Sequence, residues 1–249
     1  MRKYFGLIIF IFLTFTVCSS SLSNTVFIRR AAAPPAGITY KGVAQNFNAA
    51  SASTIDTSTT LNLAAGDTVV IGKAGNGVAS SVNCGSDSSE TYVNQVSSGG
   101  SYPASIWVLE NVSANASATC TVTWAGPVDY RLIIAAQFSG LAISSSVDQT
   151  SCNVAACNAL TSAGTTRILQ DVSTDTADEV LVAFFVGWDY NQTLTGNGFT
   201  IIGTNDGSTN YHMAYKIVSS TGTLPGAKVA DSDTSDSYMG LLVTLRAAP

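Results

Sequence analysis

Few side chains in this sequence are of types that could carry out catalysis. The chain has one histidine, His212. It has no Gly-x-Ser-x-Gly motif, which carries the nucleophilic serine of many hydrolases. A Ser-His-Asp triad or a histidine-based zinc site would depend on that one residue. His212 lies in the alternating stretch 211–215, which indicates a strand with a packed or surface histidine. We therefore predict neither a triad nor a histidine-based metal site.

Glutamates offer another route to catalysis, because two carboxyl groups facing each other across a cleft can hydrolyse a glycosidic bond. The chain has three glutamates: Glu90, Glu110 and Glu179. Glu110 lies on an expected strand without an acidic partner. Glu179 follows Asp178 at a strand start, where a solvated acid beside a turn explains it. We predict that the protein is not an enzyme, and a carboxylate-based glycosidase stays the alternative.

An acidic cluster is the best candidate for a metal site. Carboxylates at Asp231, Asp233 and Asp236 are spaced so that they can converge on calcium. The cluster lacks the glycine and the distal glutamate of an EF-hand loop, and Asp and Ser also favour solvated turns. The matching turn of the first half, 125–129, has no such cluster, which favours a turn. We expect no cofactor, with calcium at the three aspartates as the alternative.

Aromatic residues suggest a glycan site, since exposed aromatic rings of binding sandwiches can stack on sugar rings. Trp188 and Tyr190 lie together at the end of an expected strand and are the candidate glycan-binding residues. Trp107 and Tyr215 occupy matching places in two similar halves of the chain, which favours core packing for both.

Cysteines predict disulfides. Four of them follow the N-terminal segment: Cys84, Cys120, Cys152 and Cys157. An even number in an exported protein indicates disulfides, and four cysteines allow three pairings. We favour Cys84 with Cys120, which would join two strands, and Cys152 with Cys157, which would close a small loop. A zinc site is disfavoured because Cys152-x4-Cys157 has no second matching pair.

The N-terminus has the layout of a secretory signal peptide. A basic start precedes an apolar run at 7–17, and small residues follow it. The run is too short for a comfortable membrane span. A lipid-anchored Cys18 and dibasic processing at Arg29-Arg30 remain alternatives for the mature start. We predict a secreted or cell-surface protein with no membrane span in its mature chain.

Composition excludes several classes of protein. Hydrophobic residues make up 46% of the chain and charged residues 11%, while Ser and Thr together number 59. This balance of apolar content and low charge excludes a disordered chain. A net charge of −5 leaves too few basic residues for a nucleic-acid-binding face. The expected partners are extracellular, either a second copy of the chain in a homo-oligomer or filament, or a glycan.

Short runs rich in Val, Ile, Thr and aromatic residues, separated by turn-forming residues, predict strands along the whole chain. They lie at 60–63, 67–71, 90–96, 104–112, 118–124, 131–138, 166–172, 179–187, 198–202, 211–218, 227–230 and 238–245. Features recur about 108–111 residues apart, so each half holds the same order of strands. We predict an all-β antiparallel β-sandwich, jelly-roll-like, with a pseudo-two-fold relation from internal duplication. We favour one fused body, and two sandwiches in tandem are the alternative.

Three stretches carry a resemblance to known proteins. They are LNLAAGDTVV at 61–70, TVTW at 121–124 and QFSGL at 137–141. Together they resemble secreted microbial β-sandwich modules with an internal two-fold repeat, whose activity is uncharacterised. The resemblance implies the fold and export, and it implies no activity.

The expected organisation has five parts. They are a signal peptide with a short pro-segment at 1–30, a Pro/Ala leader with an extra strand at 31–58, a first β repeat at 59–143, a disulfide-bearing connector at 144–164 and a second β repeat at 165–249. The extra strand carries Ile38, Tyr40, Val43 and Phe47, and we expect no counterpart for it in the second half. It can pair with an edge of its own sandwich, or cross to a neighbouring copy as a donor strand.

A low charge and a surface rich in hydroxyl groups suit extracellular material. We therefore predict a non-enzymatic, secreted structural or adhesive β-sandwich protein, with filament assembly by N-terminal strand donation as one route. A stand-alone glycan-binding protein is the alternative, and a glycoside hydrolase is a further one.

Overall fold

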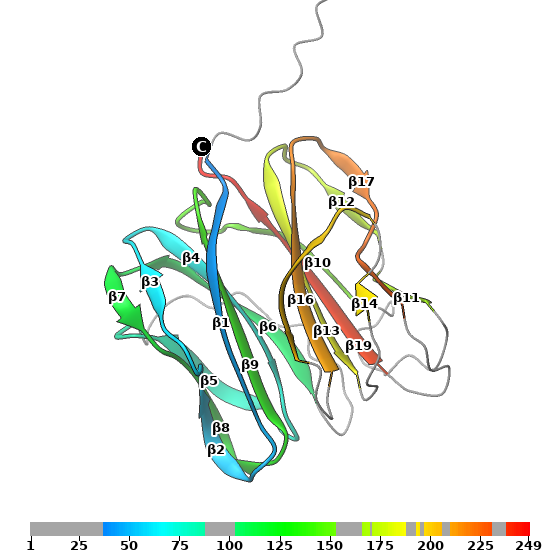
Figure 1. The fold of residues 1–249 in the computed structure, drawn as a ribbon. Coiled ribbons are helices and arrows are strands. Elements are labelled where there is room, and N and C mark those ends of the chain that lie inside the picture. The colour runs from blue at the N-terminus through cyan, green and yellow to red at the C-terminus, as the bar shows by residue number, and fades with distance from the viewer. Residues whose placement is uncertain are drawn as a thin grey trace, which may run out of the picture. The chain divides into compact units, whose positions relative to one another are not determined.

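The structure is a computed structural model that describes residues 37–87, 103–152, 166–169, 171–187, 193–194, 197–205, 210–230 and 238–249 (Figure 1). Every regular secondary-structure element in these ranges is a β-strand, and all the strand pairs are antiparallel. The predicted all-β antiparallel fold class is therefore confirmed. The described ranges hold no helix that is long and apolar enough to cross a membrane.

The first half of the chain forms one large sheet and two small ones. The large sheet has the order β1 (Thr39–Asn48), β9 (Arg131–Ser139), β4 (Asp67–Ala74) and β6 (Ala104–Val112). The small sheets are β2 (Ala52–Asp56), β8 (Cys120–Val128) and β5 (Ala79–Cys84), and the pair β3 (Leu61–Leu63) with β7 (Asn115–Ala118). In Figure 1, β1 runs beside β9, its hydrogen-bonded neighbour.

The second half repeats this plan. Its large sheet has the order β10 (Val147–Cys152), β19 (Tyr238–Arg246), β13 (Glu179–Gly187), β16 (Asn210–Val218) and β15 (Thr200–Asn205). The small sheets are β11 (Thr166–Ile168), β18 (Lys228–Ala230) and β14 (Thr193–Leu194), and the pair β12 (Val172–Thr174) with β17 (Gly222–Leu224).

Each strand pairing of the first half has a counterpart in the second half. The pairs β1–β9, β4–β9, β4–β6, β2–β8, β5–β8 and β3–β7 match β10–β19, β13–β19, β13–β16, β11–β18, β14–β18 and β12–β17. Among the described strands, only β15 lacks a counterpart. This pattern supports the predicted duplication and jelly-roll-like topology, which remain interpretations.

The N-terminal strand was expected to lie outside the repeat, and that expectation is wrong. β1 has β10 as its counterpart, since each pairs with the last strand of its own half. The mostly polar sequence of β10, VDQTSC, carries too weak a strand pattern to be recognised.

The two large sheets share one apolar core. Alternate side chains of β4, β6 and β9 pack with those of β13, β16 and β19, while the opposite faces of the large sheets form separate cores with the small sheets of their own halves. The large sheets are thus covered on both faces, which explains the nearly continuous apolar runs of their central strands. Whether the halves count as one fused sandwich or as two in tandem stays an interpretation.

The large sheets approach each other closely at Gly72 on β4. A Cβ atom at that position would lie 2.6 Å from Cδ2 of Phe184, a fully buried ring on β13. The absence of a side chain at Gly72 therefore makes room for Phe184 in the shared core.

The residue-by-residue alignment of the two halves predicted from sequence is shifted. Trp107 on β6 is buried in the core between the first-half sheets, whereas Tyr215 on β16 packs against the shared core. Because successive residues of a strand face opposite sides, aligning these two residues places opposite faces in register. Trp107 does pack in a core, at 7% exposure, as expected.

Candidate functional site

The solvent side of the sheet β2-β8-β5 presents two rows of polar residues. Thr54 lies opposite Thr123, and Thr123 lies opposite Ser81. In the next row Asp56 lies opposite Thr121, and Thr121 lies opposite Asn83. We call this set the hydroxyl face: Thr54, Asp56, Ser81, Asn83, Thr121 and Thr123. Neighbouring strands of a sheet lie about 4.8 Å apart, so the rows form a regular array.

Alternation along the strands explains why these side chains face solvent. Ile55 on β2 and Val122 and Trp124 on β8 are buried in the core below the sheet. The residues between them therefore point to the opposite side, where Thr54 is exposed and Thr123 is half-buried.

A disulfide and an indole hydrogen bond hold this sheet. Cys84 on β5 and Cys120 on β8 lie opposite each other and are disulfide-bonded, with their Cα atoms 3.9 Å apart. This is the pairing that the sequence favoured. The Trp124 indole Nε1 donates to the carbonyl oxygen of Gly77 in the turn before β5, at 3.1 Å. The hydroxyl face therefore sits on a cross-linked sheet with a packed underside.

The hydroxyl face carries one ionisable group, Asp56. The Thr121 hydroxyl donates to Asp56 Oδ1 at 2.6 Å, which ties this carboxylate to the row. The other members are hydroxyls and an amide, groups that both donate and accept hydrogen bonds. Such a surface suits a neutral partner that also offers hydroxyl groups.

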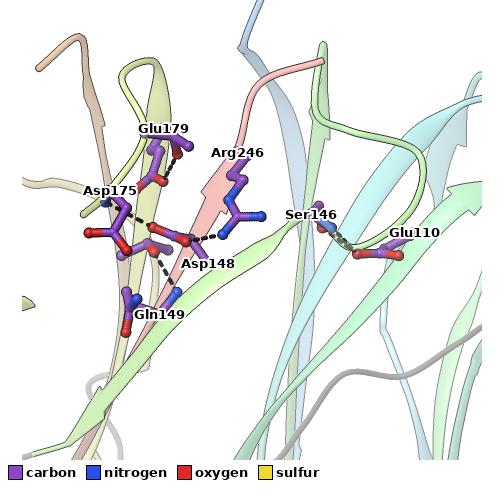
Figure 2. Close-up of polar contacts among 9 residues, drawn as sticks. Glu110, Ser146, Asp148, Gln149, Asp175, Glu179 and Arg246 are labelled. Carbon is purple, nitrogen blue, oxygen red and sulfur yellow. Dashed lines mark hydrogen bonds and ion pairs between the residues drawn. The ribbon is translucent and has the colours of Figure 1, made fainter. Parts of the chain in front are cut away.

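A second polar cluster, the carboxyl cluster, consists of Asp148, Glu179 and Arg246 (Figure 2). Glu179 begins β13, Arg246 ends β19, and the two are directly opposite in the sheet. Arg246 Nη2 donates to Asp148 Oδ1 in an ion pair, and the backbone N–H of Asp175 donates to Asp148 Oδ2 at 3.4 Å. The Thr176 hydroxyl donates to Glu179 Oε1.

A register shift in β10 places Asp148 in this cluster. The pairing of β10 with β19 is interrupted between Val147 and Thr150, and the extra residue of such a bulge can redirect a side chain. The Gln149 N–H bonds to the Thr244 hydroxyl at 2.9 Å instead of to a strand carbonyl. The Asp148 side chain is only 1% exposed, so it points inward to Arg246.

Burial and neighbouring charges shift the pKa values of Glu179 and Asp148 in opposite directions. Burial raises the pKa of Glu179 from 4.5 to about 7, and the hydrogen bond and charge of Asp148 add to that rise against the opposing effects of Thr176 and Arg246. Burial also raises the pKa of Asp148, but hydrogen bonds from Arg246, Glu179 and the Asp175 backbone outweigh it and lower that pKa below 3.8. The pKa of Glu179 therefore lies above that of Asp148, so Asp148 ionises first as the pH rises.

The expectation of a solvated Glu179 is wrong, because this residue is fully buried. The adjacent Asp178 does form the turn, with a φ of 65°, but Glu179 itself already pairs with Arg246 on β19 and Val218 on β16. Glu179 accepts from Thr176, and Asp148 is held by Arg246 and the Asp175 backbone, so both carboxyl groups have structural partners within the chain.

Glu110 has partners that the sequence did not reveal. Its carboxylate accepts the backbone N–H of Ser145 at 3.0 Å, and the N–H and hydroxyl of Ser146, both at 2.6 Å (Figure 2). Glu110 is 4% exposed on β6, so it anchors the connection between β9 and β10. Three hydrogen bonds to a buried carboxylate explain this residue without catalysis.

A groove of about 540 Å³ lies between β1 and β15. Gln45 on β1 lines it and donates through Nε2 to the carbonyl oxygen of Thr204 on β15, at 3.0 Å. Nearby, His212 is 3% exposed, with Nδ1 3.1 Å from the Thr204 hydroxyl. His212 is therefore a packed histidine on a strand, as the sequence indicated.

The extra-strand residues are part of the chain's own sandwich. Ile38 is buried, and Tyr40, Val43 and Phe47 pack against the shared core. Tyr40 stacks on Tyr215 with ring centroids 5.1 Å apart. Of the two outcomes expected for this strand, pairing inside the chain is the one found, so donation to a neighbour would require β1 to leave β9.

Several predicted site residues lie outside the described residues. They are Trp188, Tyr190, Asp231, Asp233, Asp236 and Cys157. Cys152 ends β10, but its side chain is not described. The glycan site at Trp188, the calcium site and the second disulfide therefore stay predictions. Within the described part of the chain, no group of three His, Cys, Asp or Glu side chains could hold a metal ion.

Comparisons of the chain with protein-family models, with curated proteins and with solved structures found no match.

Proposed function

We propose that this chain is a non-enzymatic, secreted adhesive protein that attaches to neutral polysaccharide through the hydroxyl face. The observation that carries the proposal is the composition of that face. Five of its six members, all except Asp56, are neutral hydroxyl or amide side chains, and none is basic. The predicted signal peptide and the low charge of the chain support a function outside the cell.

The side chains of the hydroxyl face disfavour anionic partners and typical protein interfaces, and they favour neutral sugars. A face without Lys or Arg offers little to phosphate or sulfate groups, which bind through charge-assisted hydrogen bonds. The face also lacks large apolar side chains, which form the centre of protein interfaces. Sugar hydroxyls can donate to and accept from Thr, Ser and Asn in the same way as water does. Each such bond contributes only about 0.5–1.5 kcal/mol, so attachment would depend on many bonds at once.

A charge placed in the middle of the array is the direct test. Thr123 lies on the central strand between Thr54 and Ser81, so Thr123→Lys puts a hydrated ammonium group among the hydroxyls. We expect this variant to bind insoluble neutral polysaccharides, such as cellulose, chitin and β-glucans, about tenfold less than the unchanged protein, equivalent to about one lost hydrogen-bonded contact. Binding is measured by co-sedimentation.

Thr223→Lys is the matched control, because Thr223 is an exposed threonine on the short strand β17 of the second half. It adds the same charge away from the hydroxyl face and should bind as the unchanged protein does. Equal binding by the two variants would place adhesion elsewhere, and no binding to any of the neutral polysaccharides would refute the proposal.

A further inference from the structure

We infer that the carboxyl cluster is a pH-operated clasp: one proton shared by Glu179 and Asp148 holds β10 on its sheet, and loss of that proton loosens β10. The inference is independent of the proposed adhesion. It concerns β10, the strand that begins the second half and that, among the described strands, pairs with β19 alone.

Unsatisfied atoms show where the shared proton belongs. Glu179 Oε2 is buried and receives no hydrogen bond, while Oε1 already accepts from Thr176. A buried carboxylate oxygen without a donor is costly, whereas a protonated oxygen can itself donate to the Asp148 carboxylate. The geometry therefore fits a protonated Glu179 beside an ionised Asp148.

The charges around Glu179 and Asp148 balance only when Glu179 is protonated and Asp148 is ionised. Arg246 on β19 carries the positive charge, Asp148 on β10 the negative one, and Asp175 in the turn before β13 is the other acid that acts on Arg246. The β16 residue opposite Glu179 is Val218, which adds no charge. With Glu179 neutral, the carboxyl cluster has no net charge.

Loss of the proton changes this balance. The Glu179 carboxylic acid releases its proton to water and becomes a second buried carboxylate beside Asp148, so one guanidinium now faces two negative charges. Movement of Asp148 relieves the repulsion most easily, because β10 is an edge strand with an interrupted ladder at that point. Strands β13 and β19 are held by neighbours on both sides.

The pH dependence of the clasp follows from the raised pKa of Glu179. The pKa of Glu179 is raised in the folded protein from its ordinary value of 4.5 to about 7. The stabilisation by protonated Glu179 is therefore fully present below pH 4.5 and is lost as the pH rises through about 7. The lowered pKa of Asp148 acts in the opposite sense, so its contribution is lost as the pH falls below 3.8. The clasp is therefore closed in mildly acidic solution and opens above neutral pH.

Amide hydrogen exchange of β10 as a function of pH tests the clasp in the full chain. Glu179→Gln mimics the protonated acid, because its amide can accept from Thr176 and donate to Asp148. After correction for intrinsic exchange, we expect protection of the β10 amides to fall about tenfold or more between about pH 5 and pH 8 in the unchanged protein, and to stay within about twofold in Glu179→Gln.

Asp175→Asn is the matched control, since it removes one negative charge nearby but not the shared proton. It should keep the pH dependence of the unchanged protein, and His212 is present in all three proteins. The proposal is overturned if Glu179→Gln loses protection as the unchanged protein does, or if the unchanged protein shows no loss. It is also overturned if β4 amides in the first half lose protection equally, because the change would then be global.

Discussion

Replacing Gly72 with valine should destabilise the protein by about 3 kcal/mol, the upper part of the range for an overpacked core. The added Cβ would lie 2.6 Å from the Phe184 ring, closer than side-chain atoms can approach. Phe184 has no free space to move into, because it is fully buried in the core shared by the two large sheets. Strand β4 cannot retreat either, since it is hydrogen-bonded to β6 and β9 on its two sides.

Urea unfolding measures this effect, and two further variants isolate its cause. Gly126→Val on β8 is the matched control, because nothing lies within 4 Å of a Cβ at that position. It should change the free energy of unfolding by less than about 0.5 kcal/mol, as surface substitutions usually do. Adding Phe184→Leu to Gly72→Val should recover part of the loss, which a double-mutant cycle would detect as coupling. Equal stability of the two valine variants would contradict the close packing of the sheets.

Replacing Cys84 and Cys120 together by serine should cost about 3–4 kcal/mol, the chain-entropy value for a disulfide that closes a loop of 36 residues. Both positions are buried, so the serine hydroxyls find a poor environment and add to the loss. The double variant avoids an unpaired thiol that could react with another molecule.

Reduction provides the companion measurement. A reductant should lower the unfolding free energy of the unchanged protein by more than that of the double serine variant, in which only the predicted Cys152–Cys157 disulfide remains to be reduced. If reduction has no effect on the unchanged protein in denaturant, where the disulfide is accessible, the contribution of this disulfide to stability is negligible and the prediction fails.

The strongly apolar strands could be predicted from the sequence almost residue by residue. The predicted ranges 104–112 and 179–187 coincide with β6 and β13, because strands buried on both faces read as continuous apolar runs between turn signals. The short strands β2, β5 and β10 were missed. They are rich in Ser, Thr, Ala and Asn, whose weak pattern does not separate an exposed strand from a loop.

The sites depend on register and on long-range contacts, which the sequence does not display. Asp148 and Glu179 lie on strands that are separated in the chain and in the sheet order, and the pairing of β10 with β19 is interrupted at Asp148. The hydroxyl face needs the pairing of three strands, two of them unpredicted, to align Thr54, Thr123 and Ser81. Of the two favoured cysteine pairings, Cys84 with Cys120 is confirmed, although the sequence alone allows three ways to pair four cysteines.

The closing of each half by its first and last strands governs the order in which the chain can fold. β1 forms its ladder with β9, and β10 forms its ladder with β19, so neither large sheet is complete until its last strand exists. Such non-local pairing gives a high contact order, which slows folding by orders of magnitude relative to local topologies. In a chain of this kind the apolar strands stay unpaired until late in folding, so they need protection from one another until the sheets close.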